Sequence, residues 1–344
     1  MALEKTTLTD AKIRALLSEH YGITAKEIRR LAMGSANCYI IHTDGKAVFL
    51  KEFQSGFSKE DIEREALLLE HLSRSGVPTA RFIPTRRGGF VLANGTHLIA
   101  LQEYIEGEAY TYDAFPDAML PSLARMLGTI HGALKEYPLP ADMGTNWLND
   151  YSPDEAAAFY DGLMPLAGSQ ADDMNILRLL GDLQYKKELA YRCESYKPYF
   201  EGITYGGTHG DYQGCQVIGE KGGIRAVIDF SSARVLPLSW EIIRSFVQSS
   251  DVSRENATVD CDALCDYVRE YLKVAPLTRR DLEAMPYVYL YQLARSRYGF
   301  RQYLTTDSED RESLLRFAFW RTDMCRHLEE HAKELSDALI DLLQ

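Results

Sequence analysis

Two short stretches in the second half of the chain carry the chemistry that organises the rest of the sequence. They are residues 208–218, THGDYQGCQVI, and residues 226–230, AVIDF. Each contains one aspartate, Asp211 or Asp229, beside a run of β-forming residues, and a Lys-Gly-Gly turn at 221–223 separates them. We expect the hairpin to bring the two carboxylates near one another. Such a pair suits phosphoryl transfer, in which one carboxylate takes the proton of the acceptor hydroxyl and the other holds Mg²⁺.

The first third of the chain is rich in β-forming residues. Runs at 38–41 and 47–51 flank an Asp-Gly turn, which predicts a hairpin. Beyond that third the pattern is mostly helical, apart from a β-rich island at 204–230. We therefore predict an N-terminal nucleotide-binding lobe and a C-terminal catalytic and substrate-binding lobe. The predicted lobes are residues 1–104 and residues 105–344.

The motif at Asp211 resembles that of the aminoglycoside phosphotransferase superfamily. The shared features are His209-Gly210-Asp211, an amide side chain five positions later at Gln216, and Ile-Asp-Phe at 228–230. This superfamily includes choline, homoserine and methylthioribose kinases. The resemblance is nearest to its bacterial spore-coat kinase-like branch, which is similar to type II homoserine kinases.

The resemblance implies a protein-kinase-like, bilobal fold of the α+β class, with a small β-rich N-terminal lobe and a larger, mostly helical C-terminal lobe. It implies that Asp211 is the catalytic base and that Asp229 is the principal Mg²⁺ ligand. Gln216 stands where the family has Asn, so its amide oxygen lies one methylene further out. Mg²⁺ demands short, near-octahedral contacts. Either the loop retreats and Gln216 still binds the metal, or metal binding is weaker.

A kinase-like N-terminal lobe also needs a turn over the phosphates, a lysine on a strand and a glutamate on the next helix. The turn with Gly34, Ser35 and Asn37 can lend backbone N–H groups to phosphate oxygens, although a plain hairpin turn has the same signature. Lys51 ends a strand-like run and matches the family's strand lysine, which pairs with the α- and β-phosphates. Lysines at strand edges are common as well.

Helical geometry selects the glutamate that pairs with Lys51. Residues 59–75 have a helical pattern that ends before Gly76. The apolar stripe of this helix consists of Ile62, Leu68, Leu69 and Leu72. Glu65 falls inside the stripe, whereas Glu63 falls well outside it. Because a carboxylate on an apolar face is costly unless it is paired, we predict that Glu65 pairs with Lys51.

Residues 101–107, LQEYIEG, resemble the hinge between the two lobes of this superfamily. The resemblance implies that backbone groups of this segment bind the purine edge of ATP, or of GTP. The sequence does not separate the residues that make the contacts. The candidates are Gln102, Glu103, Tyr104 and Ile105.

Composition narrows the class of protein. The 344 residues carry a net charge of -12, which disfavours nucleic acid or an anionic membrane as the main partner. The six cysteines are scattered without the four-ligand spacing of a zinc site, and they suit a reducing compartment. No apolar run has the length of a membrane helix. We expect a cytoplasmic protein, either a monomer or a homodimer.

Two functions remain open. The first is a kinase that moves the γ-phosphate of ATP or GTP to a hydroxyl of a small molecule, with Mg²⁺. The second is a pseudokinase or nucleotide-binding scaffold, for example in a spore coat, which Gln216 favours. The presence of Lys51, Asp211 and Asp229 together argues for the first. A protein kinase is disfavoured because no Asp-Phe-Gly or Ala-Pro-Glu segment follows Asp229.

Overall fold

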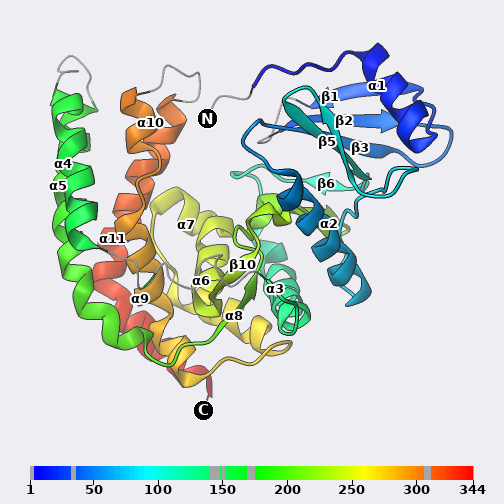
Figure 1. Cartoon of the computed structure of the whole chain (residues 1–344). Coiled ribbons are helices and arrows are strands. Elements are labelled where there is room, and N and C mark those ends of the chain that lie inside the picture. Colours follow the sequence, from blue (N-terminus) through cyan, green and yellow to red (C-terminus); the bar gives the residue numbers. More distant parts are fainter. Residues whose placement is uncertain are drawn as a thin grey trace. The chain divides into compact units, whose positions relative to one another are not determined.

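The chain forms two compact units, coloured along the sequence in Figure 1. The computed structural model describes residues 4–31, 36–139, 148, 152–168, 175–305 and 311–343. The N-terminal unit comprises Met1–Ala109 and Gln216–Ser232, and the C-terminal unit comprises Tyr110–Cys215 and Ala233–Gln344. Residues 216–232 thus group with the N-terminal unit by their contacts, while the lobe boundary between 104 and 105 stays a prediction.

The N-terminal unit is built on an antiparallel sheet of five strands in the order β1-β2-β3-β5-β4. The strands are β1 (Glu27–Leu31), β2 (Asn37–His42), β3 (Val48–Phe53), β4 (Val91–Asn94) and β5 (His97–Glu103). The predicted hairpin is confirmed, because β2 pairs with β3 and places Tyr39 opposite Leu50. On its other side β3 pairs with β5, with Lys51 opposite Ala100. Lys51 therefore lies on a central strand and not on a sheet edge.

Two helices accompany this sheet. Helix α1 (Asp10–Leu16) continues as a π-helical turn to Tyr21, and it buries Ile13 against the sheet core. Helix α2 (Lys59–Arg74) begins where the Ser58 hydroxyl accepts a hydrogen bond from the Asp61 N–H at 3.1 Å. It ends before Gly76, whose φ of 86° needs the freedom of glycine. The predicted apolar stripe of α2 is buried, and Glu65 lies within it.

A second sheet of the N-terminal unit carries the chain to Asp229. Its strands, in order, are β6 (Glu108–Ala109), β8 (Val217–Glu220) and β9 (Gly223–Val227). The predicted turn is confirmed: Lys221 and Gly222 have positive φ values of 50° and 79°, as in a type I′ hairpin turn. The Val227 N–H donates to the Pro78 carbonyl at 2.9 Å, which ties β9 to the segment that follows α2.

The strand before Asp211 belongs to the C-terminal unit. This strand, β7 (Tyr205–Thr208), pairs with β10 (Arg234–Pro237) in an antiparallel sheet of two strands. The predicted β-rich island at 204–230 is confirmed, because β7, β8 and β9 all lie within it, but its strands belong to two different sheets. Their partners β6 and β10 are two and four residues long, too short for a recognisable sequence pattern.

The rest of the C-terminal unit is helical, as predicted. Its helices are α3 (Leu120–Leu134), α4 (Pro153–Gly168), α5 (Ile176–Arg192), α6 (Leu238–Ser249), α7 (Asp251–Asn256), α8 (Cys261–Leu272), α9 (Arg279–Arg295), α10 (Phe300–Thr305) and α11 (Arg311–Ile340). Helix α4 runs beside α5, and α9 runs beside α11 (Figure 1). A β-rich first unit and a helical second unit confirm the α+β class. Within the described ranges, no helix has both the length and the apolar character that crossing a membrane requires.

Candidate active site

Three predicted residues meet in the N-terminal unit, and each comes from a different element. The Lys51 Nζ, on β3, lies 3.7 Å from the Asp229 Oδ1, which follows β9. The Glu65 carboxylate, on α2, accepts a hydrogen bond from the backbone N–H of Phe230. A strand lysine, a helix glutamate and the aspartate after the hairpin therefore form one charged cluster.

The charges of this cluster act on one another. Burial raises the pKa of Glu65, while the charge of Lys51 opposes that shift and the charge of Asp229 adds to it. Burial also acts to lower the pKa of Lys51, but Asp229 and Glu65 outweigh it and the pKa is raised. Lys51 therefore remains an ammonium group. The ion pair of Lys51 is with Asp229, and Glu65, which is 5% exposed, contributes as a neighbouring charge.

The backbone around Asp229 is specialised. Its φ of 64° is in the left-handed region, which costs a non-glycine residue about 1 kcal/mol and which aspartate tolerates better than most. The Ile228 N–H donates to the Gln216 carbonyl at 2.9 Å, and the Ser231 hydroxyl donates to Asp229 Oδ1 at 3.1 Å. The two predicted metal ligands, Gln216 and Asp229, therefore lie on directly connected backbone segments.

The predicted hinge lies at the end of β5. The Gln102 side-chain amide donates to the Ala80 carbonyl at 3.3 Å. The Glu103 N–H donates to the Arg81 carbonyl at 2.8 Å, and the Glu103 carboxylate forms a two-point ion pair with the Arg81 guanidinium. The strand ends at Glu103, so Tyr104 and Ile105 have irregular backbone and are half-buried.

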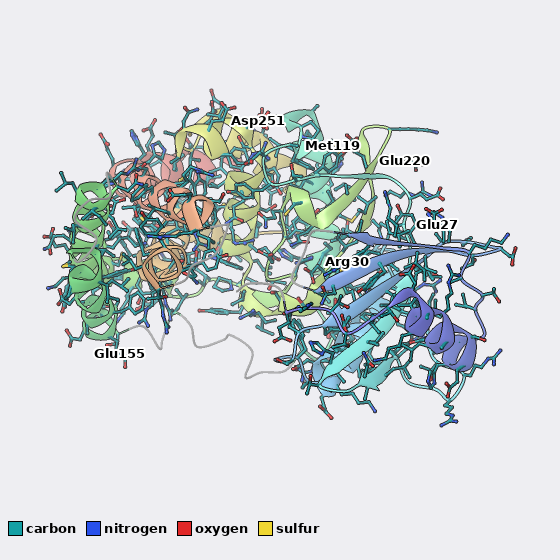
Figure 2. All side chains as sticks on the ribbon, turned by 90° about the horizontal axis from the view of Figure 1, so that it is seen from above. Glu27, Arg30, Met119, Glu155, Glu220 and Asp251 are labelled. Atoms are coloured by element: carbon teal, nitrogen blue, oxygen red, sulfur yellow. The ribbon has the colours of Figure 1, made fainter. Side chains whose placement is uncertain are left out.

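The structure describes only part of the predicted phosphate-binding turn. Gly34 and Ser35 lie outside the described residues. Asn37 is fully buried, and its amide oxygen accepts a hydrogen bond at 2.7 Å from Arg30, the β1 residue labelled in Figure 2. Its amide nitrogen donates to the Glu4 carbonyl at 3.1 Å. The side chain of Asn37 thus links β2 to β1 and to the N-terminal segment at Glu4.

In the C-terminal unit, helix α6 fixes the segment that contains Asp211. Glu241 is fully buried, and its carboxylate accepts hydrogen bonds from the backbone N–H groups of His209, at 3.0 Å, and of Gly210. Gly210 has a φ of 82°, so the turn at this point needs glycine. Arg244, one turn further along α6, donates a hydrogen bond to Asp211 Oδ1. One helix therefore holds both the backbone before Asp211 and its carboxylate.

A buried chain of hydrogen bonds supports Glu241. His131, on α3, donates from Nε2 to Glu241 at 3.0 Å, and its Nδ1 lies 2.8 Å from the Tyr271 hydroxyl. Burial raises the pKa of Tyr271, so it remains a phenol that can donate to Nδ1. Burial also acts to raise the pKa of Glu241, but the hydrogen bonds from His131 and from the His209 N–H outweigh it and lower the pKa. His131 therefore holds the Glu241 carboxylate in place.

A cavity of about 390 Å³ lies next to this segment within the C-terminal unit. Its lining residues are Gly210, Arg234, Leu236, Trp240, Arg244, Gln292, Arg295, Ser296 and Arg321. Gly210 immediately precedes Asp211, and Arg244 contacts the Asp211 carboxylate. The cavity therefore adjoins the candidate base.

The profile of a family described as the phosphotransferase enzyme family matches residues 27–277, which is most of the sequence. This chain belongs to the phosphotransferase enzyme family. The membership confirms the resemblance to aminoglycoside phosphotransferases and related kinases. The narrower assignment to the spore-coat branch stays a prediction.

Solved structures share the fold of this phosphotransferase-family chain. A spectinomycin phosphotransferase in complex with ADP and spectinomycin is 15% identical, has a TM-score of 0.65, and covers 97% of this chain and 99% of its own. An aminoglycoside phosphotransferase from Alicyclobacillus acidocaldarius is 16% identical, with a TM-score of 0.64 and coverage of 97% and 98%. A microcompartment-associated aminopropanol kinase is 16% identical, with a TM-score of 0.63 and coverage of 95% and 99%. These likenesses confirm the protein-kinase-like fold. No curated protein sequence matches the chain.

The residues of this phosphotransferase-family chain fit a magnesium ion at Asp229. Mg²⁺ prefers oxygen ligands and is usually held by one or two carboxylates together with water and phosphate oxygens. Asp229 supplies a carboxylate that already attracts the Lys51 ammonium, and the adjoining segment carries the amide of Gln216. In the described part of the chain, no group of three or more His, Cys, Asp or Glu could hold a metal alone. The donor set therefore suits a metal shared with a bound phosphate group.

Sequence reasoning missed the arginines of this site. Arg244 contacts Asp211 directly. Arg234, Arg295 and Arg321 had no sequence signal, because they lie on separate elements that only the fold brings to one cavity. For Arg244, a weak signal was available: it follows Glu241 by three residues, so both lie on one helix face.

Proposed function

We propose that this chain transfers the γ-phosphate of ATP to a hydroxyl group of a small molecule. The observation that supports this function best is the charged cluster of the N-terminal unit. There Lys51 pairs with Asp229 at 3.7 Å beside the buried Glu65. A kinase-type phosphotransferase needs these three residue types to hold phosphates and a metal.

Lys51 would steady the phosphate groups of the nucleotide. Its raised pKa, caused by Asp229 and Glu65 against the effect of burial, keeps it charged at neutral pH. Glu65 would keep the lysine charged and in place, because its buried carboxylate lies in the same cluster. The backbone of the half-buried residues Tyr104 and Ile105, beyond the end of β5, would bind the purine edge. This assignment leaves GTP as an alternative donor.

Asp211 would act as the general base of the transfer. The acceptor hydroxyl oxygen forms a bond to the γ-phosphorus, and the bond from that phosphorus to the β,γ-bridging oxygen breaks. ADP leaves with the electron pair, and Asp211 takes the hydroxyl proton. Glu241 would hold the backbone before Asp211, and Arg244 would orient its carboxylate.

Asp229 and Gln216 would hold the magnesium ion. When bound, Mg²⁺ neutralises charge on the phosphate oxygens. The side chain of Gln216 is one methylene longer than that of asparagine. The hydrogen bond from the Ile228 N–H to the Gln216 backbone carbonyl therefore determines where the amide oxygen of Gln216 can lie. We also propose a cytoplasmic location, because the six cysteines, all of which lie in the described ranges, form no disulfide.

Small molecules are the proposed acceptors because several proteins of this fold act on them. Those proteins include a spectinomycin phosphotransferase and an aminopropanol kinase. Structures of this fold have been solved with ADP, with AMP, and with AMP-PNP and Ca²⁺. These nucleotides support ATP as the donor.

The test measures nucleotide binding and nucleotide consumption separately. Mg·ATP binding to the wild type, to Lys51→Met and to the exposed control Lys12→Met is measured by calorimetry. We expect Lys51→Met to weaken binding by roughly tenfold or more, the loss of one charge-assisted contact, and Lys12→Met to bind like the wild type. ATP consumption is then screened over aminoglycosides, macrolides, amino alcohols and sugars. Failure of the wild type to bind Mg·ATP would remove the basis of the proposal.

A scaffold without catalysis is the second candidate, and the observation that favours it is glutamine at position 216. In that case Mg·ATP raises the melting temperature of the protein, but no acceptor in the screen stimulates ATP consumption. A kinase shows both effects, so the two measurements together separate the candidates.

A further inference from the structure

The cavity beside Asp211 has a strongly cationic lining. Four arginines contribute to it, and they come from four elements: Arg234 on β10, Arg244 on α6, Arg295 on α9 and Arg321 on α11. Of the described residues that line this cavity, none is an aspartate or a glutamate. The nearby carboxylate of Asp211 pairs with Arg244. The positive charge of the lining therefore exceeds what Asp211 alone can balance.

Two of these guanidinium groups retain hydrogen-bonding capacity. Within the described chain, Arg244 Nη1 and Arg321 Nε are buried and lack a hydrogen-bond partner. Arg244 uses its other terminal nitrogen for Asp211, and Arg321 uses one terminal nitrogen for the Ser296 hydroxyl. An unsatisfied buried N–H of a charged group is costly, and an anionic ligand oxygen would satisfy it.

Aromatic rings pack against the guanidinium group of Arg321. Its guanidinium carbon lies 4.6 Å from the ring centroid of Phe317 and 5.7 Å from that of Tyr298. Burial lowers the pKa of Arg321, and the like charge of Arg244 acts in the same direction. Such a group gains more than a solvated lysine would from an anion placed against it, because less water must be displaced and the planar donors are already oriented.

The size of the cavity limits the ligand. A volume of about 390 Å³ lies at the lower end of the range for small-molecule sites, which suits a molecule of the size of one sugar ring. The same lining would repel a polycationic molecule. Gly210 and Arg244 place the cavity against Asp211, so a bound molecule would present its hydroxyl groups near the candidate base.

We propose that this cavity binds the carboxylate or phosphate group of a small, hydroxyl-bearing molecule, which makes the phosphoryl acceptor an anionic one. The acceptor role rests on the proposed function, whereas the binding of an anion by the cavity does not. In the transfer, the hydroxyl oxygen of this molecule bonds to the γ-phosphorus of ATP, ADP departs with the bridging oxygen, and the proton passes to Asp211. Arg244 connects the cavity with the candidate base, since it lines the cavity and contacts Asp211.

The experiment uses four probes that share one pyranose ring but differ in charge. Glucose is neutral, glucosamine is cationic, glucuronate carries a carboxylate and glucose 6-phosphate carries a phosphate. Binding to the full-length protein is measured by calorimetry at low ionic strength. We expect at least one anionic probe to bind tenfold or more tighter than glucose, with glucosamine the weakest, because a charge-assisted contact to arginine discriminates by about that factor. The comparison of the two anionic probes distinguishes a carboxylate site from a phosphate site.

Variants locate the binding. Arg321→Gln and Arg234→Gln should each remove most of the preference for the anionic probe. Arg316→Gln should retain it, because Arg316 lies on the same helix as Arg321 but is exposed and bonds to Ser313. Two cavity variants are used because Arg321 is packed against aromatic rings, and a thermal melt establishes that each is folded.

Four outcomes would overturn the proposal. The first three are equal binding of all four probes, tightest binding of glucosamine, and no binding of either anionic probe at about 10 mM, a concentration above the dissociation constant of even a weak site. A fourth is that Arg321→Gln weakens Mg·ATP binding and leaves the probes unaffected, since the cavity would then serve the nucleotide. If Lys51→Met loses Mg·ATP binding but still binds the anionic probe, the cavity and the nucleotide site are independent binding sites.

Discussion

The variant Glu241→Gln tests how much the buried Glu241 carboxylate stabilises the segment before Asp211. The side chain keeps its length and loses its charge. It also exchanges one acceptor oxygen for an NH₂ group. In the wild type one oxygen accepts from the His131 ring and the His209 N–H, and the other accepts from the Gly210 N–H. A glutamine can satisfy only one of these two sets of donors.

The expected loss of stability follows from that geometry. If the amide oxygen faces His131 and His209, its NH₂ group faces the Gly210 N–H, and one hydrogen bond to a charged acceptor is lost, which costs about 2 kcal/mol. The two remaining bonds become neutral and lose about half their strength, or about 1 kcal/mol each. Removal of a buried charge offsets part of this sum. We expect Glu241→Gln to lower the free energy of unfolding by about 2–4 kcal/mol.

Tryptophan fluorescence during urea denaturation is a suitable assay. Two of the three tryptophans, Trp240 and Trp320, lie in described parts of the C-terminal unit, so their signal follows the unit that contains Glu241. The control is Glu188→Gln on α5, whose side chain is 55% exposed and 3.7 Å from Arg192. An exposed pair of this kind contributes about 0.5 kcal/mol or less.

The pH dependence provides an independent check. The pKa of Glu241 is lowered from its ordinary value of 4.5, so its contribution to stability is complete above that value and is lost as the pH falls through the lower, folded-state pKa. The difference between the wild type and Glu241→Gln should therefore be constant near neutral pH and should shrink in acid. A variant as stable as Glu188→Gln, or a difference that grows in acid, would refute this account of the Glu241 carboxylate.

Three further predictions concern the segment from Asp211 to Gln216. Gly214→Ala should destabilise the protein by about 1–3 kcal/mol, because the new Cβ would lie 2.3 Å from the Phe115 ring. The control Gly132→Ala, whose new Cβ has open space within α3, should stabilise the protein slightly. Urea denaturation of both variants checks this prediction. Gln216→Asn should lower the Mg²⁺ concentration needed for half-maximal ATP consumption, and an unchanged requirement would exclude its amide as a metal ligand. Asp211→Asn should reduce kcat by about 10²–10⁴ without loss of Mg·ATP binding, and an unaltered kcat would rule it out as the base.

Local signals were sufficient for the N-terminal charged cluster. An Asp-Gly turn between two β-type runs fixed the hairpin that carries Lys51, and the stripe of α2 identified Glu65 as the buried glutamate. Turn chemistry and helical periodicity involve neighbours within a few positions, so a single sequence contains them. Asp229 was found by its motif. Its ion pair with Lys51, in preference to Glu65, depends on side-chain distances that periodicity does not specify.

The pairing of strands that are distant in the chain could not be predicted from the sequence. Strand β7 pairs with β10 and strand β8 pairs with β6, and both partners are too short to have a period of their own. The arginine cavity has the same origin, because its four cationic residues come from separate strands and helices. Each arginine alone is an ordinary polar residue of its element. Only their shared orientation distinguishes them, and that orientation is a property of the tertiary fold.

The grouping of residues 216–232 with the first 109 residues has a consequence for the order of events during synthesis. The five-stranded sheet can form once residue 103 has left the ribosome, but β6 must wait for β8 and β9 before its own sheet can close. Lys51 consequently spends the synthesis of more than a hundred residues without its ion-pair partner. A fragment that stops at residue 109 would have a folded sheet and a half-buried lysine without its ion-pair partner Asp229, so we expect such fragments to depend on chaperones until the hairpin arrives.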